Sequence, residues 1–251
     1  MIKRFLSILC ALALAASPAR ANFGAGNCLM GFWSGCTDVN FSLAYVTNAV
    51  DSVDASTFTF SSQSFGAETC GKRYIVVGLG GGGVAATISS VTIGGITATQ
   101  ILNINTATGI ASRGGMFYAE VPTGTTGSVV VTWSTTIARC GIAIWRMVNP
   151  ITMTPTSSDT QTTTSASVMT FATTTIPTNG GAIGYIYMDD SAATRTWTWT
   201  GMTENFDTAI ENADNVMHTG STNTTAGSTT RSATVSGNST PSYIGLWAAF
   251  N

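Results

Sequence analysis

The residues best suited to catalysis in this 251-residue chain are few and scattered. His218 is the only histidine, and no Gly-x-Ser-x-Gly nucleophile elbow accompanies it. A serine hydrolase would need a triad assembled from distant parts of the chain. A glycosidase would need two opposed carboxylates; Glu120, Glu204 and Asp207 are available, but sequence spacing in a β protein does not tell where they lie relative to one another. The sequence therefore predicts a protein that is not an enzyme.

A run of acidic residues has the oxygen chemistry that calcium prefers. Its members are Glu204, Asp207, Glu211 and Asp214. Carboxylates at this density could hold Ca²⁺, but the Asp-x-Asp-x-Asp-Gly pattern of a calcium loop is absent. We favour an exposed acidic loop at these residues and predict neither a metal nor another cofactor.

Two tryptophans have the spacing of a sugar-binding platform. Trp197 and Trp199 alternate with threonines, so in a strand both rings point to one face. If they were exposed, they would stack on sugar rings, as would Phe32 and Trp33 in a loop near the N-terminus. Large aromatic side chains are more often buried, so we favour core packing for the pair.

A glycine-rich segment, 78–83, follows an apolar stretch and contains the three spaced glycines of a dinucleotide-binding loop. That motif works because a helix N-terminus faces the pyrophosphate. The residues after it are β-branched and serine-rich, and neither a ribose-binding acid nor a Gly-Lys-Ser/Thr sequence follows. We interpret the segment as a flexible turn or loop.

Charge and composition narrow the function classes further. Only 9% of the residues are charged, and ten basic against twelve acidic residues leave a formal net charge of −2. No basic cluster is present to neutralise phosphates, which argues against nucleic acid as a partner. Abundant Thr, Ser and Gly with many β-branched residues are typical of short strands joined by tight turns.

The N-terminus has the features of a secretory signal peptide at 1–21. Lys3 and Arg4 precede a short apolar run, and Ala19-Arg20-Ala21 matches the small-x-small cleavage site. The apolar run is shorter than the roughly 20 residues that span a bilayer. We expect a secreted, periplasmic or cell-surface protein without a membrane span after cleavage, beginning with a Cys- and Gly-rich leader at 22–40.

Four cysteines follow the signal peptide: Cys28, Cys36, Cys70 and Cys140. An even number in an exported chain indicates disulfides, and four cysteines allow three pairings. We favour Cys28 with Cys36, which closes a small loop, and Cys70 with Cys140. The spacing does not match structural zinc.

An internal repeat organises the rest of the chain. Segment 142–147 resembles 244–249 with Trp145 over Trp247, and 128–132 lies over 230–234 at the same offset of 102 residues. Upstream, Val91 and Ile93 lie over Trp197 and Trp199, which supports a core role for those tryptophans. The repeat predicts one β unit in two copies, 41–150 and 151–251.

Short strands separated by Gly, Pro and Asn turns predict an all-β fold. The expected strands are 41–47, 57–65, 73–80, 87–93, 96–102, 116–121, 128–133 and 141–147, then 162–174, 182–188, 195–200, 202–206, 216–219, 231–236 and 242–250. We predict an internally duplicated antiparallel β-sandwich, either jelly-roll-like or made of two closely packed Ig-like halves.

The order of four segments resembles a broad group of uncharacterised bacterial and phage-associated proteins. These segments are 73–78, 91–95, 116–125 with its Pro-x-Gly-Thr turn, and the Val-rich 128–133. The resemblance covers most of 58–250 and is at the level of the fold. It implies a β-sandwich in an exported, surface or virion-associated structural protein, and the signal peptide favours the secreted or cell-surface setting.

Three functional hypotheses follow. The first is an exported, non-catalytic structural or adhesive surface protein acting through sandwich surface contacts, with surface polysaccharide or self-association through sheet edges as its contacts. The second is a carbohydrate-binding module, secreted or associated with a phage fibre. The third is an outer-membrane β-barrel, which the short strands disfavour.

Overall fold

The computed structural model describes residues 40–82, 86–104, 112–163, 167–189, 196–211, 216–235 and 242–251. Internal contacts divide the chain into two units, residues 1–36 and 37–251, and the described residues all belong to the second. Residues 1–39, which include the predicted signal peptide and nearly all of the leader, lie outside the described residues. The described part consists of strands that pair antiparallel, which confirms the predicted all-β class.

Nine strands form copy 1 and eight form copy 2 among the described residues. Copy 1 contains β1 (Ser42–Asp51), β2 (Ala55–Ser64), β3 (Arg73–Gly82), β4 (Ile88–Ile93), β5 (Ile96–Thr97), β6 (Thr99–Ile104), β7 (Ser112–Glu120), β8 (Thr126–Ile137) and β9 (Cys140–Val148). Copy 2 contains β10 (Ser157–Thr163), β11 (Val168–Ile176), β12 (Gly181–Asp189), β13 (Trp197–Thr200), β14 (Thr203–Glu211), β15 (Val216–Asn223), β16 (Gly227–Val235) and β17 (Ser242–Phe250).

The two copies have the same strand order apart from β5, which has no counterpart among the described strands of copy 2. Inner sheet 1 runs β1-β9-β3-β7-β6 and outer sheet 1 runs β2-β8-β4-β5, while inner sheet 2 runs β10-β17-β12-β15-β14 and outer sheet 2 runs β11-β16-β13. In each copy the first strand lies beside the last, and the chain crosses repeatedly between the two sheets. This order is that of a jelly roll and differs from the Ig arrangement.

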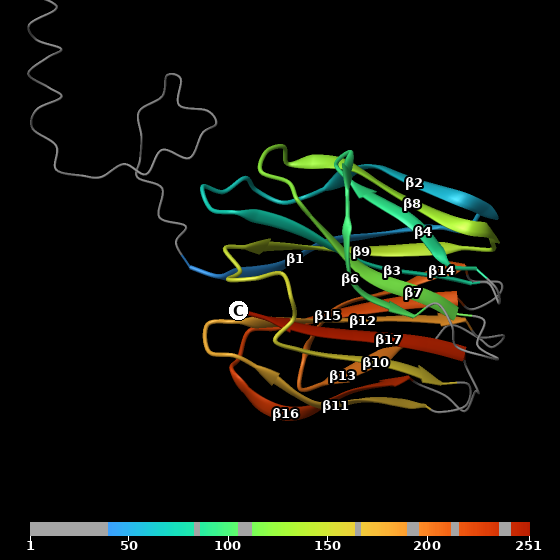
Figure 1. Ribbon diagram of the computed structural model, residues 1–251. Coiled ribbons are helices and arrows are strands. Elements are labelled where there is room, and N and C mark those ends of the chain that lie inside the picture. Colours follow the sequence, from blue (N-terminus) through green and yellow to red (C-terminus); the bar gives the residue numbers. More distant parts are fainter. Residues whose placement is uncertain are drawn as a thin grey trace, which may run out of the picture. The chain divides into compact units, whose positions relative to one another are not determined.

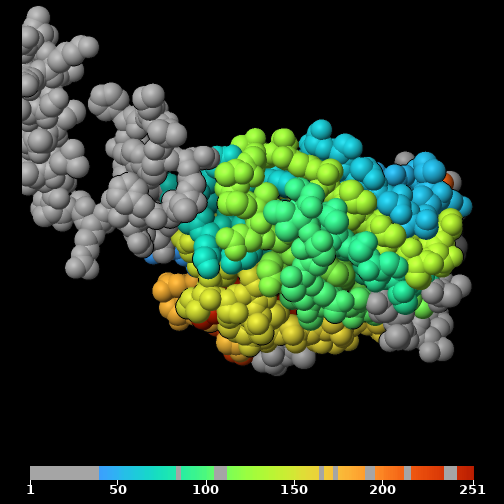
Figure 2. Space-filling model, turned by 45° about the horizontal axis from the view of Figure 1, so that its top comes forward, coloured from blue at the N-terminus to red at the C-terminus, as the bar shows by residue number. Residues whose placement is uncertain are grey.

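The four sheets stack into four layers with three apolar cores between them (Figure 1). The first core lies between the sheets of copy 1 and includes Phe58 and Val77. The second lies between the two inner sheets and includes Trp145 and Tyr185. The third lies between the sheets of copy 2. In the space-filling view, copy 1 in blue to green packs directly on the yellow and orange segments of copy 2 (Figure 2).

The inner sheets are covered on both faces, and this explains the glycine-rich segment. Instead of a loop, Gly78 to Gly82 form the second half of the buried central strand β3. A Cβ at Gly78 would lie 2.9 Å from Cγ of Tyr185, and one at Gly80 would overlap Cβ of Tyr187. Gly78 and Gly80 are therefore required by the close approach of aromatic residues from copy 2. The loop interpretation was wrong because this partner is more than 100 residues away.

The two tryptophans matched in the repeat are buried in different cores. Trp145 lies between the inner sheets, whereas Trp247 lies inside copy 2. Successive residues of a strand point to opposite faces, so residues that occupy equivalent positions in the two copies must point to the same face. Trp145 and Trp247 point to opposite faces, and the offset that relates β9 to β17 is therefore an odd number and not 102. The offset of 102 does hold for β8 and β16, where Val129 and Arg231 both point into their own copy's core.

Replacing Gly80 by alanine should lower the free energy of unfolding by about 1–3 kcal/mol, because the added methyl group overpacks the core between the copies. Urea denaturation of the two proteins measures the difference. The matched control is the same substitution in a Tyr187→Gly background, where the overlapping atom is absent. An equal cost in both backgrounds would contradict the proposed contact.

Candidate functional sites

His218 is buried between the copies and is unavailable as a general base. It lies on β15, with no exposed surface, and its ring packs edge-on against Phe206 at 4.9 Å between centroids. The Tyr185 hydroxyl donates to the carbonyl of Gly141 and lies 3.3 Å from Nδ1 of His218, while Nε2 has no hydrogen-bond partner among the described residues. Burial lowers the pKa of His218 to about 3. The imidazole is therefore neutral and structural.

The two tryptophans considered as a sugar platform are not exposed. Trp197 and Trp199 are 2% and 7% exposed and belong to the core of copy 2. The Trp199 ring stacks on Phe171, and its Nε1 donates to the hydroxyl of Thr219 at 3.0 Å. The pair therefore packs as the repeat suggested and offers no ring face to a ligand. The other two candidates, Phe32 and Trp33, lie outside the described residues.

The acidic run forms a strand and does not assemble a metal site. Glu204, Asp207 and Glu211 lie on β14 rather than in a loop, and Asp214 lies outside the described residues. Asp207 accepts a hydrogen bond from the backbone N–H of Trp197 at 2.7 Å, and burial raises its pKa. Among the described residues no group of three or more His, Cys, Asp or Glu side chains could hold a metal ion.

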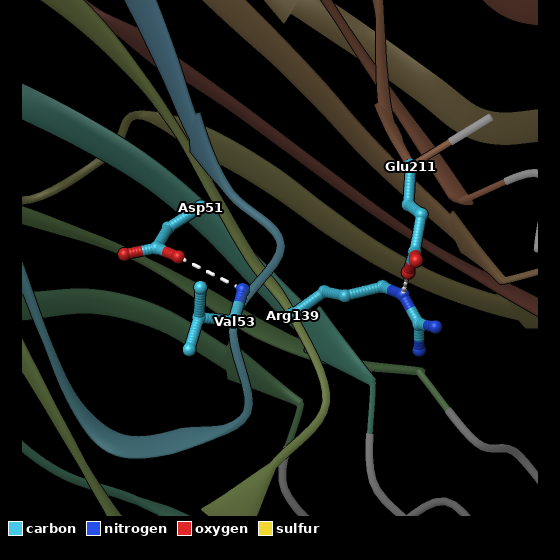
Figure 3. A network of polar contacts seen from close by, with 4 residues as sticks. All are labelled: Asp51, Val53, Arg139 and Glu211. Atoms are coloured by element: carbon cyan, nitrogen blue, oxygen red, sulfur yellow. Dashed lines mark hydrogen bonds and ion pairs between the residues drawn. The ribbon is translucent and has the colours of Figure 1, made fainter. Parts of the chain in front are cut away.

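Glu211 instead forms an ion pair with Arg139, as Figure 3 shows. Arg139 lies in the connection between β8 and β9 of copy 1, so the pair joins the two copies. In the same view Asp51 accepts a hydrogen bond from the backbone N–H of Val53 at 2.9 Å, which fixes the turn after β1. These carboxylates therefore have structural partners.

The predicted bridge between Cys70 and Cys140 is not formed. Cys140 is a free thiol with no exposed surface, and burial raises its pKa, so it is unreactive in the folded protein. Cys70 is disulfide-bonded. Because Cys140 is free, the partner of Cys70 lies outside the described residues. The predicted pair of Cys28 with Cys36 also lies outside them.

Each outer sheet presents a small grid of hydroxyl groups on its outward face. In outer sheet 1, residues paired across the adjacent strands β2, β8 and β4 form two rows that run across the sheet. In outer sheet 2, residues paired across β11, β16 and β13 form two equivalent rows. The rows are Thr57-Thr132-Ser90 and Thr59-Val130-Thr92 in copy 1, and Val168-Thr234-Thr198 and Thr170-Ser232-Thr200 in copy 2. We call these the hydroxyl grids.

Both hydroxyl grids have the same composition, five Ser or Thr side chains and one valine. Within a grid, side chains are spaced by about 4.8 Å across strands and about 7 Å along them. All twelve residues are exposed or half-buried. The inward-facing residues of the same strands differ between the copies. When the strand pairings of the two outer sheets are aligned, Val91 of copy 1 corresponds to Trp199 of copy 2, and Val129 corresponds to Arg231. The grids have thus kept their chemistry while the interior changed.

The outer sheets also lack charge to an unusual degree. Their seven strands contain a single charged residue, Arg231. Its side chain points inward and is 1% exposed. The outward faces therefore carry no charged side chain and present mainly hydroxyl groups. The two-residue alternation of a half-buried strand could have indicated these faces from the sequence, because hydroxyl residues alternate with core residues in β2, β13 and β16.

Comparison with known proteins adds no assignment. No protein-family model matches the chain, and no curated protein is similar to it in sequence. Among the described residues, no helix has the length and hydropathy needed to cross a membrane. The class is therefore defined by the fold alone: a tandem jelly-roll protein with two neutral hydroxyl-bearing faces.

The free energy of unfolding should fall as the pH drops below about 6.5, because the unfolded state protonates His218 first. Its folded-state pKa of about 3 lies below the ordinary value of 6.5, so the loss is about 1.4 kcal/mol per pH unit, or about 2 kcal/mol by pH 5. Urea titrations of wild type and His218→Asn across this range measure the difference. Carboxyl groups whose pKa is raised in the folded protein increase the free energy of unfolding as the pH falls, but they do so equally in the wild type and in His218→Asn. Identical pH profiles would contradict the buried neutral imidazole.

Proposed function

We propose that the protein is an exported, non-catalytic adhesive protein that attaches to neutral polysaccharide through its two hydroxyl grids. The observation that carries the proposal is the absence of charge from the outward faces of both outer sheets, together with their regular hydroxyl rows. Uncharged, polyhydroxylated polymers are the partners that such a face suits, because each hydroxyl both donates and accepts hydrogen bonds.

The position of the hydroxyl grids supports a bridging role. The outer sheets are the first and last layers of the four-layer stack, so their grids face in opposite directions (Figure 1). One molecule could therefore contact two surfaces at once and hold them together. Two weak faces acting together also raise the apparent affinity without any new contact.

The residues with catalytic chemistry favour the same proposal. His218 and Cys140 are fully buried, and the side chains of Asp207 and Glu211 are engaged by Trp197 and Arg139. The side chains that could take part in catalysis thus stabilise the interior and the junction between the two copies. The proposal also requires export to a compartment that contains extracellular polymers. The signal sequence predicted at 1–21 is the basis for expecting that export.

The experiment measures adsorption to insoluble neutral polysaccharides, such as cellulose and cross-linked dextran, and clumping of the same particles. Thr57→Glu with Thr59→Glu charges the grid of copy 1, and Thr198→Glu with Thr200→Glu charges that of copy 2. Either double variant should still adsorb but should no longer clump particles. The four-fold variant should lose about tenfold or more in adsorption, since charge on the face must be desolvated.

The matched control adds the same charge away from the hydroxyl grids. Val53→Glu and Ile151→Glu alter side chains that are 68% and 82% exposed in turns. These variants should adsorb and clump as the wild type does. If the grid variants behave like the controls, or if each single-face variant still clumps particles, adhesion through the grids is wrong.

A further inference from the structure

Each of the four sheets has an edge strand on either side among the described residues. The eight edge strands are β1 and β6, β2 and β5, β10 and β14, and β11 and β13. A long, regular edge strand is a template to which another chain can add a strand, and soluble proteins usually avoid it with short strands, charged side chains, prolines or β-bulges. The edges therefore show where this fold prevents such pairing and where it permits it.

Seven of the eight edge strands are short or irregular. β5 has two residues and β13 has four. The pairing register shifts, as at a β-bulge, in β1, β2, β6, β11 and β14. Such irregularities twist the edge and interrupt the even row of N–H and C=O groups that an added strand needs.

The eighth edge strand, β10, has none of these protections. Its seven residues pair with β17 in an unbroken register, from Ser157 opposite Ala249 to Thr163 opposite Tyr243. The strand contains no lysine, arginine or proline, and its only charged residue is Asp159. Among the described strands, β10 is thus the one long and regular edge.

The β10 edge also lies at the surface of the molecule. Ser158, Thr160 and Thr162 are exposed, although the β17 residues paired with them are buried in the core between the two copies. β10 therefore projects beyond the cover that copy 1 gives to the rest of inner sheet 2. Figure 2 shows the yellow residues, which include β10, on the visible face. The edge is open to a further strand.

We propose that β10 binds β10 of a second molecule of this chain in an antiparallel pair, which joins the two inner sheets 2 into one continuous sheet. Two identical strands paired in this way are related by a two-fold axis, so the contact is self-complementary and closes at two molecules. Main-chain hydrogen bonds hold the pair, as in strand addition to other sheet edges. Residues opposite each other must point to the same face, so the axis passes beside a single central residue.

Length and charge determine which residue is central. A pair centred on Thr160 aligns all seven residues of both strands and places each Asp159 opposite Gln161 of the second molecule. The Gln161 amide donates to Asp159 of its own strand at 2.9 Å, and its second N–H can donate to the opposite Asp159. A pair centred on Asp159 would set two carboxylates opposite each other, which is unfavourable. The register is therefore centred on Thr160.

The dimer keeps the direction of the four-layer stack. Because the two-fold axis is perpendicular to inner sheet 2, both copy 1 grids face one side and both copy 2 grids face the other. A variant charged on one grid therefore still has a single neutral side when it is a dimer. Pairing through β10 uses no residue of the hydroxyl grids, so it stands or falls independently of polysaccharide binding.

Sedimentation velocity of the full chain, in a concentration series up to about 100 μM, tests the interface. The wild type should form dimers. Thr160→Lys sets two ammonium groups opposite each other and Thr160→Glu sets two carboxylates, so each variant alone should dimerise about fivefold or more weakly. An equimolar mixture of the two variants should restore the dimer, because lysine then faces glutamate.

The matched control is Ser158→Lys, which adds the same charge on the same exposed face but lies opposite Thr162 of the second molecule. This variant should dimerise as the wild type does. A monomeric wild type, or a dimer that Thr160→Lys and Thr160→Glu leave unchanged, would overturn the proposal.

Cysteine cross-linking tests the register. Thr160→Cys places two thiols opposite each other at a Cα separation of about 4.5–5.5 Å, so mild oxidation should give a covalent dimer on a non-reducing gel. In Ser158→Cys the two thiols lie four residues apart along the strands, about 14 Å, and cross-linking should not exceed that of the wild type. Equal cross-linking of the two variants, or none by Thr160→Cys, would overturn the pair centred on Thr160.

Discussion

The fit between glycines on one inner sheet and aromatic side chains on the other is the constraint on which the structure depends. Gly78 and Gly80 of β3 leave room for Tyr185 and Tyr187 of β12, and in the reverse direction Gly220 receives the ring of Trp145. A side chain at any of these glycines would separate the sheets. Because the sheets approach so closely, the central strands are covered on both faces.

This constraint explains where the chain places its chemistry. A strand buried on two sides must be apolar or hydrogen-bonded throughout, so the only histidine remains neutral and a cysteine remains a free thiol between layers. Solvent meets the protein mainly at the outer sheets, the sheet edges and the ends of the sandwiches. The proposed function accordingly concerns the hydroxyl grids, which lie on the outward faces of the outer sheets.

The sequence predicted the class of fold, the duplication and the burial of the paired tryptophans, since these follow from strand periodicity and turn residues. It could not predict that residues 78–82 belong to a central strand, because these glycines are explained by residues far along the chain. The register of Trp145 against Trp247 was wrong by an odd number of residues, which reverses the face of every side chain. The Cys70–Cys140 pair failed for a similar reason: sequence spacing does not report three-dimensional distance.

Differential scanning calorimetry can measure whether the two copies unfold together, because a shared core between the inner sheets must couple them. We expect one transition in which the calorimetric and van't Hoff enthalpies agree, since neither jelly roll can keep its inner sheet covered alone. Two separate transitions, or a calorimetric enthalpy near twice the van't Hoff value, would show that the copies unfold independently. That result would contradict the view that the glycine and aromatic contacts make them one body.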